Sequence, residues 1–510
     1  MSTRYVLIFG AALVAVACAV GPNYRKPAAP TPAAFKELPA GSEASGVEWK
    51  PAQPSDAVLR GKWWEVFGDS ELDALEDQVA VANQNLAAAE AQFRGAQALA
   101  HQARAAFFPT VTAGAAVTRS SGVVKTTTPV APGAAPPAVT TYSASLDLAW
   151  ELDLFGGIRR GVEAGVASAQ ASAADLESAR LALQAELAAD YFTLHGLDAQ
   201  RQLLDTTVAG YQTALQLTEN RYKQGVVSGV DVAQAQTQLE TTRTQATDLG
   251  IARAQLEHAI AVLIGKPPAE FSLAPAPIRV VAPPIPVILP AELLERRPDI
   301  AAAERRVAAA NAERGVATAG YFPTLALADS GGYTNTTLAH LFTLPNRLWS
   351  LGPALAETIF DGGRRRAVKE QAQAAWDAAV ATYRETVLDA FEEVEDNLAA
   401  LRILAEEATQ QATAVAAADH SLALARNRYQ GGITTYLEVV TAQTVALTNE
   451  RAAVDLLTRR MIASVNLVKA LGGGWRAADL PSRTAINARV ASPPPTQTPT
   501  PDPSKGNATH

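Results

Sequence analysis

The 510-residue sequence is poor in the residues that usually build catalytic, redox or metal centres. It has one cysteine, Cys18, which excludes an intramolecular disulfide framework, and its 6 histidines are scattered without metal-ligand spacing. The sequence also lacks a phosphate-binding loop and a nucleophile elbow. We therefore expect a protein that is not an enzyme and that uses neither a metal nor a cofactor.

Long apolar runs and strong charge are missing as well. No apolar run reaches the roughly 18 residues that a membrane-spanning helix needs, so any membrane crossing has to be made by strands. The formal net charge is -8, without long runs of like charge. Because phosphate backbones need a basic surface, we do not expect nucleic acid as a partner.

One stretch of the sequence occurs twice. Residues 221–232 begin Arg-Tyr-Lys-Gln-Gly, residues 428–439 begin Arg-Tyr-Gln-Gly-Gly, and both are followed in the same register by Ala-Gln-Thr. Two copies indicate one unit used twice. Each copy joins two long heptad-like runs through a glycine-centred turn signal. We therefore predict two helical hairpins, with tips at about 222–231 and 429–438.

The first residues predict export from the cytoplasm. Arg4 and the apolar stretch after it, ending in Ala-Val-Ala-Cys18, are typical of a secretory signal peptide over residues 1–17. The same tetrapeptide is similar to a bacterial lipoprotein cleavage site, which would make Cys18 the acylated first residue of the mature chain. Ordinary signal peptidase would instead leave a free thiol. We favour a covalent lipid, because a lone exported cysteine directly after the cut is otherwise hard to explain.

Composition divides the rest of the chain. Residues 18–60 are rich in Pro, Ala and Gly, which predicts an extended, lipid-anchored tether. A first repeat, 61–278, is joined to a second repeat, 291–476, by a proline-rich linker at 279–290. The tail, 477–510, is so poor in apolar residues that we expect it to be disordered.

Each repeat is predicted to be mainly helical. The run from about 158 to 222 has no internal proline, and residues such as Leu187 and Leu194 keep a heptad spacing, which is typical of a coiled coil. Its 65 residues would reach roughly 100 Å at about 1.5 Å per residue. A second, shorter helix is predicted between Leu72 and about Ala105.

Each repeat also contains a predicted β-hairpin, at about 108–154 and 322–360. In the strand 145–154, leucines and Trp150 on one face alternate strictly with serine, alanine and acidic residues on the other. In a soluble sandwich the apolar face would be core; in a closed membrane barrel it would meet lipid, and the acids would line a wet lumen. The strand length fits the second, since a tilted spanning strand takes about 9 to 11 residues. We assign three acids of this strand to the barrel lumen: Asp147, Glu151 and Asp153.

The ordered set of motifs resembles a known family. The motifs are Gly21-Pro22-Asn23-Tyr24 after Cys18, Phe107-Phe108-Pro109-Thr110, Arg296-Arg297-Pro298-Asp299-Ile300, Tyr321-Phe322-Pro323-Thr324 and the two tips. Together they look like the TolC/OprM-type outer-membrane factors, nearest the lipoprotein branch of multidrug efflux systems. The resemblance covers nearly the whole mature chain apart from the tail.

The resemblance implies a mainly α fold with a membrane β-barrel. Three protomers would each give four strands to one twelve-stranded barrel in the outer membrane, continuous with a helical tunnel across the periplasm. It further implies a channel that accepts substrates expelled by an inner-membrane pump through a periplasmic adaptor. Elementary chemistry supplies a reason for the trimer, because four strands cannot close a barrel and an open sheet cannot leave unpaired edges in lipid.

Two other functions fit parts of the sequence. The outer channel of a type I protein-secretion system would share the architecture. An extracellular coiled-coil scaffold would explain the helices, but it would not explain amphipathic β-hairpins placed between them.

Two acids aligned by the duplication, Asp231 and Glu438, are candidate gate residues. If the tips of three protomers converge at the periplasmic mouth, each position forms a ring of three acids, and the resemblance implies acids at a constricted opening there. The alternative is that both acids stabilise helix N-termini, each by about 0.3 to 1 kcal/mol.

Two tyrosines and two arginines complete the predicted gate. Tyr222 and Tyr429 precede each tip and would brace the constriction between neighbouring hairpins. Arg221 and Arg428 are their candidate partners.

Overall fold

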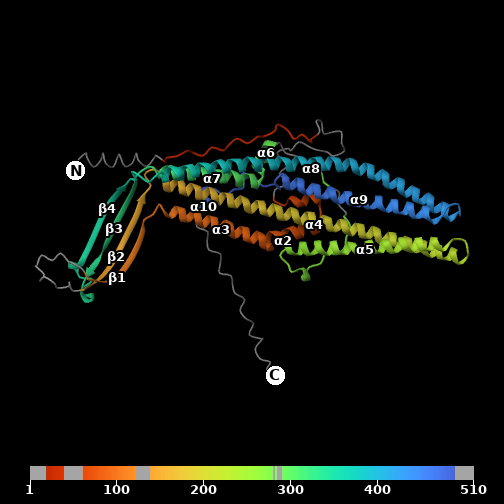
Figure 1. Ribbon diagram of the computed structural model, residues 1–510, viewed down its shortest axis with the longest axis horizontal. Helices are drawn as coiled ribbons and strands as arrows, with labels where there is room; N and C mark the ends of the chain where they lie inside the picture. The colour runs from red at the N-terminus through yellow and green to blue at the C-terminus, as the bar shows by residue number, and fades with distance from the viewer. Residues whose placement is uncertain (1–18, 39–60, 122–137, 279–281, 284–289, 489–510) are drawn as a thin grey trace, which may run out of the picture.

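The computed structural model describes the chain over residues 19–38, 61–121, 138–278, 282–283 and 290–488. It is an elongated body with a β-sheet at one end and two helical hairpin tips at the other (Figure 1). The predicted signal peptide, 1–17, and Cys18 lie outside the described residues, as does most of the predicted linker at 279–290.

The four strands form one antiparallel sheet in the order β1-β2-β3-β4. Their bounds are β1 Thr110–Ser120, β2 Val139–Leu152, β3 Thr324–Asn335 and β4 Arg347–Ala356. The predicted alternation in β2 continues across the sheet, because Leu148 pairs with Val111 of β1 and Asp147 pairs with Ser330 of β3. One face is therefore rich in large apolar side chains, many of them exposed in the single protomer, and the other carries small and polar ones.

Two very long helices, α4 and α8, connect the sheet to the tips. Each has 67 residues, which corresponds to about 100 Å. The helices have these bounds: α2 Ser70–Ala82, α3 Gln84–Ala105, α4 Gly157–Lys223, α5 Gly229–Leu263, α6 Pro290–Arg296, α7 Pro298–Ala319, α8 Arg364–Gln430, α9 Tyr436–Ala470 and α10 Arg483–Asn487. Within the described ranges, no helix combines the length and the apolar character needed to cross a membrane.

The helices lie side by side as a wall. Helix α4 packs against α3 and α5 on one side and against α7 and α9 on the other, and α8 packs against α7 and α9. The order across the wall is therefore the α3/α5 column, α4, the α7/α9 column and α8, as Figure 1 shows from bottom to top. The α3/α5 column and α8 form the two free edges, on opposite sides of the protomer.

Short and long helices meet end to end in both repeats. Asn83 Nδ2 donates to the Leu263 carbonyl at 2.7 Å, which joins α3 to the end of α5. In the second repeat Arg297 Nη1 donates to the Ala470 carbonyl at 3.2 Å, joining α7 to α9. The prediction of one helix from Leu72 to Ala105 is wrong, because Asn83 is extended, caps α3 through Leu86 N–H, and separates α2 from α3.

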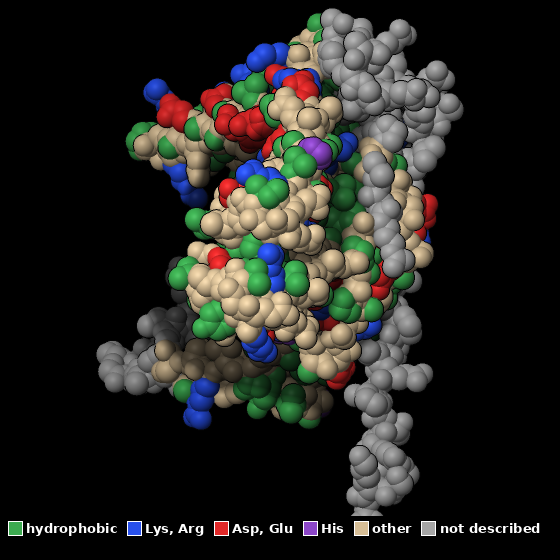
Figure 2. All heavy atoms as spheres, turned by 90° about the vertical axis from the view of Figure 1, so that its right-hand side faces the viewer, with side chains coloured by type: hydrophobic (Ala, Val, Ile, Leu, Met, Phe, Trp, Pro, Cys, Tyr) green, Lys and Arg blue, Asp and Glu red, His purple; other side chains and the backbone are tan. Residues whose placement is uncertain are grey.

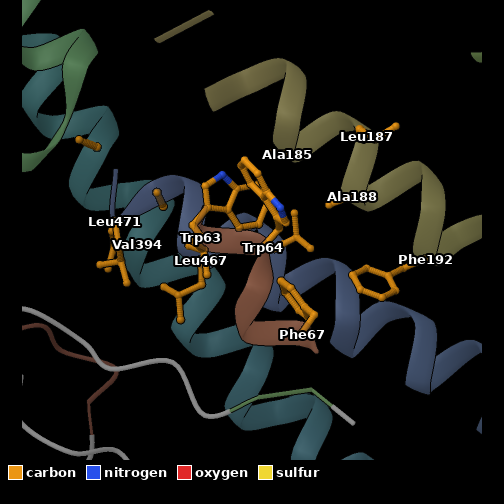
Figure 3. Close-up of a cluster of buried hydrophobic side chains, with 14 of the residues drawn as sticks. Trp63, Trp64, Phe67, Ala185, Leu187, Ala188, Phe192, Val394, Leu467 and Leu471 are labelled. Atoms are coloured by element: carbon orange, nitrogen blue, oxygen red, sulfur yellow. The ribbon is translucent and has the colours of Figure 1, made fainter. Parts of the chain in front are cut away.

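The main hydrophobic core lies where α2, α4, α8 and α9 come together. Trp63 and Trp64, in a 3₁₀ turn at Trp63–Phe67, are buried there, and Trp63 packs edge-to-face on Phe67. Figure 3 shows these rings against aliphatic side chains from α4, α8 and α9, among them Val394 and Leu467. Burial of these large rings stabilises the fold in proportion to the apolar area removed from water.

Parts of the predicted extended tether and of the predicted disordered tail pack against the helices. Residues 19–38 run along α7 and α8, and Phe35 is buried against the Phe391 ring. The prediction that 477–510 is disordered is wrong for 477–488, because α10 buries Ile486 completely against α3 and α4. In each segment, apolar side chains such as Phe35 and Ile486 pack against the helices, which composition alone did not indicate.

Candidate functional site

The two hairpin tips have the same backbone geometry. At the first, Val226 N–H donates to the Arg221 carbonyl at 2.9 Å, and Gly225 adopts a φ of 73°. At the second, Ile433 N–H donates to the Arg428 carbonyl at 2.9 Å, and Gly432 also has a φ of 73°. This is the Schellman arrangement, in which a left-handed glycine ends a helix. The duplicated glycines therefore set the shape of both tips.

The two candidate acids differ in their contacts. Asp231 accepts hydrogen bonds from Ser228 N–H at 3.0 Å and from the Ser228 hydroxyl at 3.2 Å, which forms a capping box at the start of α5. Glu438 makes no such box with Thr435. Its Oε2 lies 3.6 Å from Arg428 Nη1, in an exposed ion pair across the second tip. Asp231 is thus engaged within its own tip, and Glu438 is held only by a solvated charge.

A buried cluster joins the two tips within one protomer. Tyr429 is buried and packs edge-to-face on Tyr436, with ring centroids 5.2 Å apart. Arg221 of the first tip lies over the Tyr429 ring, 4.8 Å from its centroid, and its Nη1 donates to the Tyr429 carbonyl at 3.1 Å. Burial, reinforced by the Tyr429 neighbour, raises the pKa of Tyr436 to about 12, so this phenol is neutral.

The structure brings Arg221 and Tyr429 together but leaves Tyr222 apart. Tyr222 is more than half exposed, although its ring passes close to Gly229 in its own tip. Tyr436, the second ring of the cluster, was not predicted from the sequence. Its position two residues before the aligned acid Glu438, directly after the turn, was the available signal.

Hydrophobic side chains are exposed at both tips. Val226 and Val230 of the first tip align by the duplication with Ile433 and Leu437 of the second, and all are more than half exposed. Figure 2 shows the molecule from this end, where hydrophobic side chains reach the surface among scattered basic and acidic ones. Exposed apolar side chains that recur at equivalent positions of both tips indicate a candidate contact surface.

The strand acids divide into two groups. Asp147 lies on the polar face of β2 and accepts hydrogen bonds from the hydroxyls of Ser145 at 2.9 Å and Ser330 at 2.5 Å. Glu151 lies on the same face and is exposed. Both are therefore placed on the face that the predicted lumen requires.

Asp153 lies beyond the end of β2, and its carboxylate contacts the start of α4 instead. Its carboxylate accepts from Ile158 N–H and from Arg159 N–H and Nε, at 2.9 to 3.1 Å, which ties the strand to the start of α4. Asp361 and Arg365 repeat the arrangement before α8, with bonds of 3.1 and 2.8 Å. The assignment of Asp153 to the strand face is corrected, because the carboxylate is used to cap a helix and to pair with arginine.

The chain directly after Cys18 is held at the same junction between strand and helix. Val20 N–H donates to the Phe155 carbonyl at 3.0 Å, and Arg160 Nη2 donates to Asn23 Oδ1 at 2.8 Å. Gly21 lies so close to α7 that a Cβ there would be 2.6 Å from the Gly315 Cα. Residues 20 to 23 are therefore fixed at the junction between β2 and α4.

No described group of His, Cys, Asp or Glu side chains has the geometry of a metal site. One buried acid was not anticipated: Glu76 of α2 is fully buried, and burial, with Asp77 and Asp73 nearby, raises the pKa of its carboxyl group to about 9. Only its position on the apolar side of a short helix could have indicated this.

Known proteins share this arrangement along nearly the whole chain. A family model described as outer membrane efflux protein matches residues 75–266 and 289–473, one segment in each repeat. The pyoverdine export outer membrane protein OpmQ of Pseudomonas aeruginosa is 32% identical over 482 residues, which are 93% of this chain and 98% of that protein. The toluene efflux pump outer membrane protein TtgC of Pseudomonas putida is 31% identical over 464 residues, 90% of this chain and 93% of that protein.

A solved structure has the same fold. The outer-membrane channel OprN superposes with a TM-score of 0.80 at 32% identity, over 90% of this chain and 100% of that one. The chain belongs to the outer membrane efflux protein family. It is an outer-membrane channel of the efflux type, works with a pump, and is not an enzyme. The expected family, fold class, function and outer-membrane location are confirmed.

Proposed function

We propose that three copies of this chain form one closed exit duct, with twelve strands in the outer membrane and a helical tunnel in the periplasm. The observation that carries this proposal is the pair of free edges on opposite sides of the protomer. Strands β1 and β4 each have one unpaired side in the described sheet, and the α3/α5 column and α8 are the outermost helices of the wall. Unpaired strand edges are not tolerated in lipid, so the edges have to meet in a closed ring.

The helical edges support the same contact. Leu99 and Ile251 are exposed on the α3/α5 column, and Leu388 and Ile403 are exposed on α8. When the two contacting surfaces of a subunit differ, the subunits assemble head to tail. The assembly closes into a ring when a whole number of subunits completes one full turn, which is three subunits at one third of a turn each. Burial of these apolar edges would stabilise the trimer in proportion to the area removed from water.

The exposed apolar pairs at the tips are the proposed contact with a periplasmic adaptor, which delivers cargo from the pump. Relatives of nearly equal similarity are named for chemically unlike cargoes, pyoverdine and toluene. We therefore assign the choice of cargo to the pump and its adaptor, and only passage to this chain.

The tips are also the proposed gate. Asp231 and Glu438 would form acid rings at the periplasmic mouth, and the buried contact between Arg221 and Tyr429 would hold the two hairpins of a protomer together. The duplication suggests that Arg428 makes the matching contact with Tyr222 of the partner subunit, since Tyr222 is exposed and Arg428 is held only by a solvated pair with Glu438.

The proposed membrane attachment has two parts, the barrel and a lipid on Cys18. Residue 20 is hydrogen-bonded at the junction of β2 and α4, so an acyl chain two residues earlier would reach the periplasmic leaflet of the outer membrane. One acyl signal gives only modest anchoring and the barrel would hold the protein anyway, so the lipid would aid sorting and orientation more than retention. On the sheet, Asp147 and Glu151 would face the water-filled lumen.

Native mass and conductance test the proposal. Protein extracted from outer membranes in mild detergent should have the mass of three chains and should form channels in planar bilayers; a monomer or a non-conducting trimer would refute it. The flanking genes should identify the particular pump and periplasmic adaptor that supply this channel.

A further inference from the structure

A phenylalanine stands at every crossing between the sheet and the helices. Phe108 and Phe322 precede β1 and β3, directly before a proline, and Phe155 and Phe360 follow β2 and β4. These crossings lie together at the end of the body where the strands meet the long helices (Figure 1). Each repeat therefore contributes one phenylalanine before its hairpin and one after it.

Two of the four rings stack where the first repeat meets the second. Phe155 and Phe322 have ring centroids 4.8 Å apart and an interplanar angle of 22°. Leu152 of β2 pairs with Leu325 of β3, and the same antiparallel register continued by three residues brings Phe155 opposite Phe322. The stack therefore extends the pairing of β2 and β3 beyond the last hydrogen bonds of the sheet.

The other two rings stand at the free edges of the protomer. Phe360 follows the edge strand β4 and is 88% exposed, and Phe108 precedes the edge strand β1 and is 64% exposed. Neither ring contacts another aromatic ring within the ranges that the structure describes. After its hairpin, the first repeat thus has a stacked ring, Phe155, and the second repeat has an exposed one, Phe360.

We infer that Phe360 stacks on Phe108 of the partner subunit, in the way that Phe155 stacks on Phe322 inside the protomer. Six repeats alternate around a ring of three chains, so the ring after β4 meets the ring before β1 of the next chain. The inference rests on the proposed trimer and names a contact that trimer makes. Offset-stacked rings add stabilisation beyond their buried area. Three such stacks would complete a ring of phenylalanine side chains at the junction of barrel and tunnel.

Photo-crosslinking identifies the neighbour of Phe360 directly. A benzoylphenylalanine in place of Phe360 keeps an aromatic ring there, and irradiation of the membrane-extracted protein should join two chains, giving a band of twice the chain mass on a denaturing gel. Mass spectrometry should place the bond within residues 106–109 of the second chain. A bond to lipid or to the same chain would overturn the inference, while a trimer on a native gel would leave the proposed function intact.

A double-mutant cycle tests the same contact through the rate of trimer dissociation in detergent. Phe108→Ala and Phe360→Ala should each speed dissociation about two- to tenfold, and the double variant should be no faster than either single variant. Ile359→Ala is the matched control, because Ile359 is also 88% exposed and adjacent to Phe360. Its effect should add to that of Phe108→Ala. Additive effects of Phe108→Ala and Phe360→Ala would contradict the stack.

Discussion

Arg221 fastens the first hairpin tip to the second. Its Nη1 donates to the Tyr429 carbonyl at 3.1 Å while its guanidinium lies 4.8 Å from the centroid of the Tyr429 ring. One side chain thus makes both a hydrogen bond and a cation–π contact with the same residue of the other repeat. Because the tips surround the proposed periplasmic mouth, this contact resists their separation.

Replacing Arg221 should loosen the tips. We expect Arg221→Ala to raise the resting single-channel conductance or open probability, since it removes contacts worth about 1 to 3 kcal/mol per protomer. Arg221→Lys should be intermediate, because it keeps the charge and loses the planar stacking. Lys223→Ala, two residues later on the exposed side of the same turn, is the control. If Arg221→Ala keeps the resting conductance of the wild type, Arg221 is not part of the gate.

Substitutions of the two tip acids should distinguish an electrostatic role at the mouth from a helix-capping role. Asp231→Asn keeps an acceptor for Ser228, whereas Asp231→Ala loses the capping box and should cost about 0.3 to 1 kcal/mol of hairpin stability. If the acid rings bind cations, Asp231→Asn combined with Glu438→Gln should raise resting conductance and weaken divalent block from the periplasmic side. Block equal to that of the wild type would leave both acids as helix-terminal groups.

The strand acids should set ion preference in the lumen. We expect Asp147→Asn with Glu151→Gln to lower the cation preference of bilayer conductance, measured as a reversal potential in a salt gradient. Asp153→Asn is the control, because its carboxylate is occupied by Arg159 and backbone amides. That variant should reduce thermal stability by about 1 to 3 kcal/mol and leave selectivity unchanged. Unchanged selectivity in the first variant would contradict a role for these charges.

Glu76 should make stability depend on pH. Its folded pKa of about 9 lies above the ordinary value of 4.5, so the neutral acid contributes its full stability below about pH 4.5 and loses it progressively as the pH rises toward 9. Glu76→Gln should therefore raise the thermal unfolding temperature at pH 8 by about 2 to 5 °C and leave it nearly unchanged at pH 4. Glu90→Gln, exposed on α3, is the control. Equal shifts at both pH values would disagree with a buried neutral acid.

Cys18 should carry a covalent lipid. Mass spectrometry of the mature N-terminus should find an acylated cysteine, and Cys18→Ala should still form channels after extraction, because the barrel itself holds the protein in the membrane. Slower sorting to the outer membrane is the expected defect of that variant. A free thiol on Cys18 would refute the lipid anchor.

The sequence by itself determined the repeated unit, the long helices and the two-faced strands, because each depends on local periodicity. The glycine-centred turns at Gly225 and Gly432 mark the ends of two helices, and the alternation around Leu148 separates the two faces of a strand. These signals act over a few residues and need no knowledge of what lies beside them.

Only the tertiary structure decided how equivalent positions came to differ. Tyr429 is buried and Tyr222 is exposed although the duplication aligns them, because the second tip lies against the first within the protomer while the first has a free side. The role of Asp153 was decided more locally, because β2 ends at Leu152 and the chain turns back so that Ile158 and Arg159 donate to the Asp153 carboxylate. Contacts between distant or non-adjacent residues depend on which surfaces the fold brings together, and no local pattern encodes that choice.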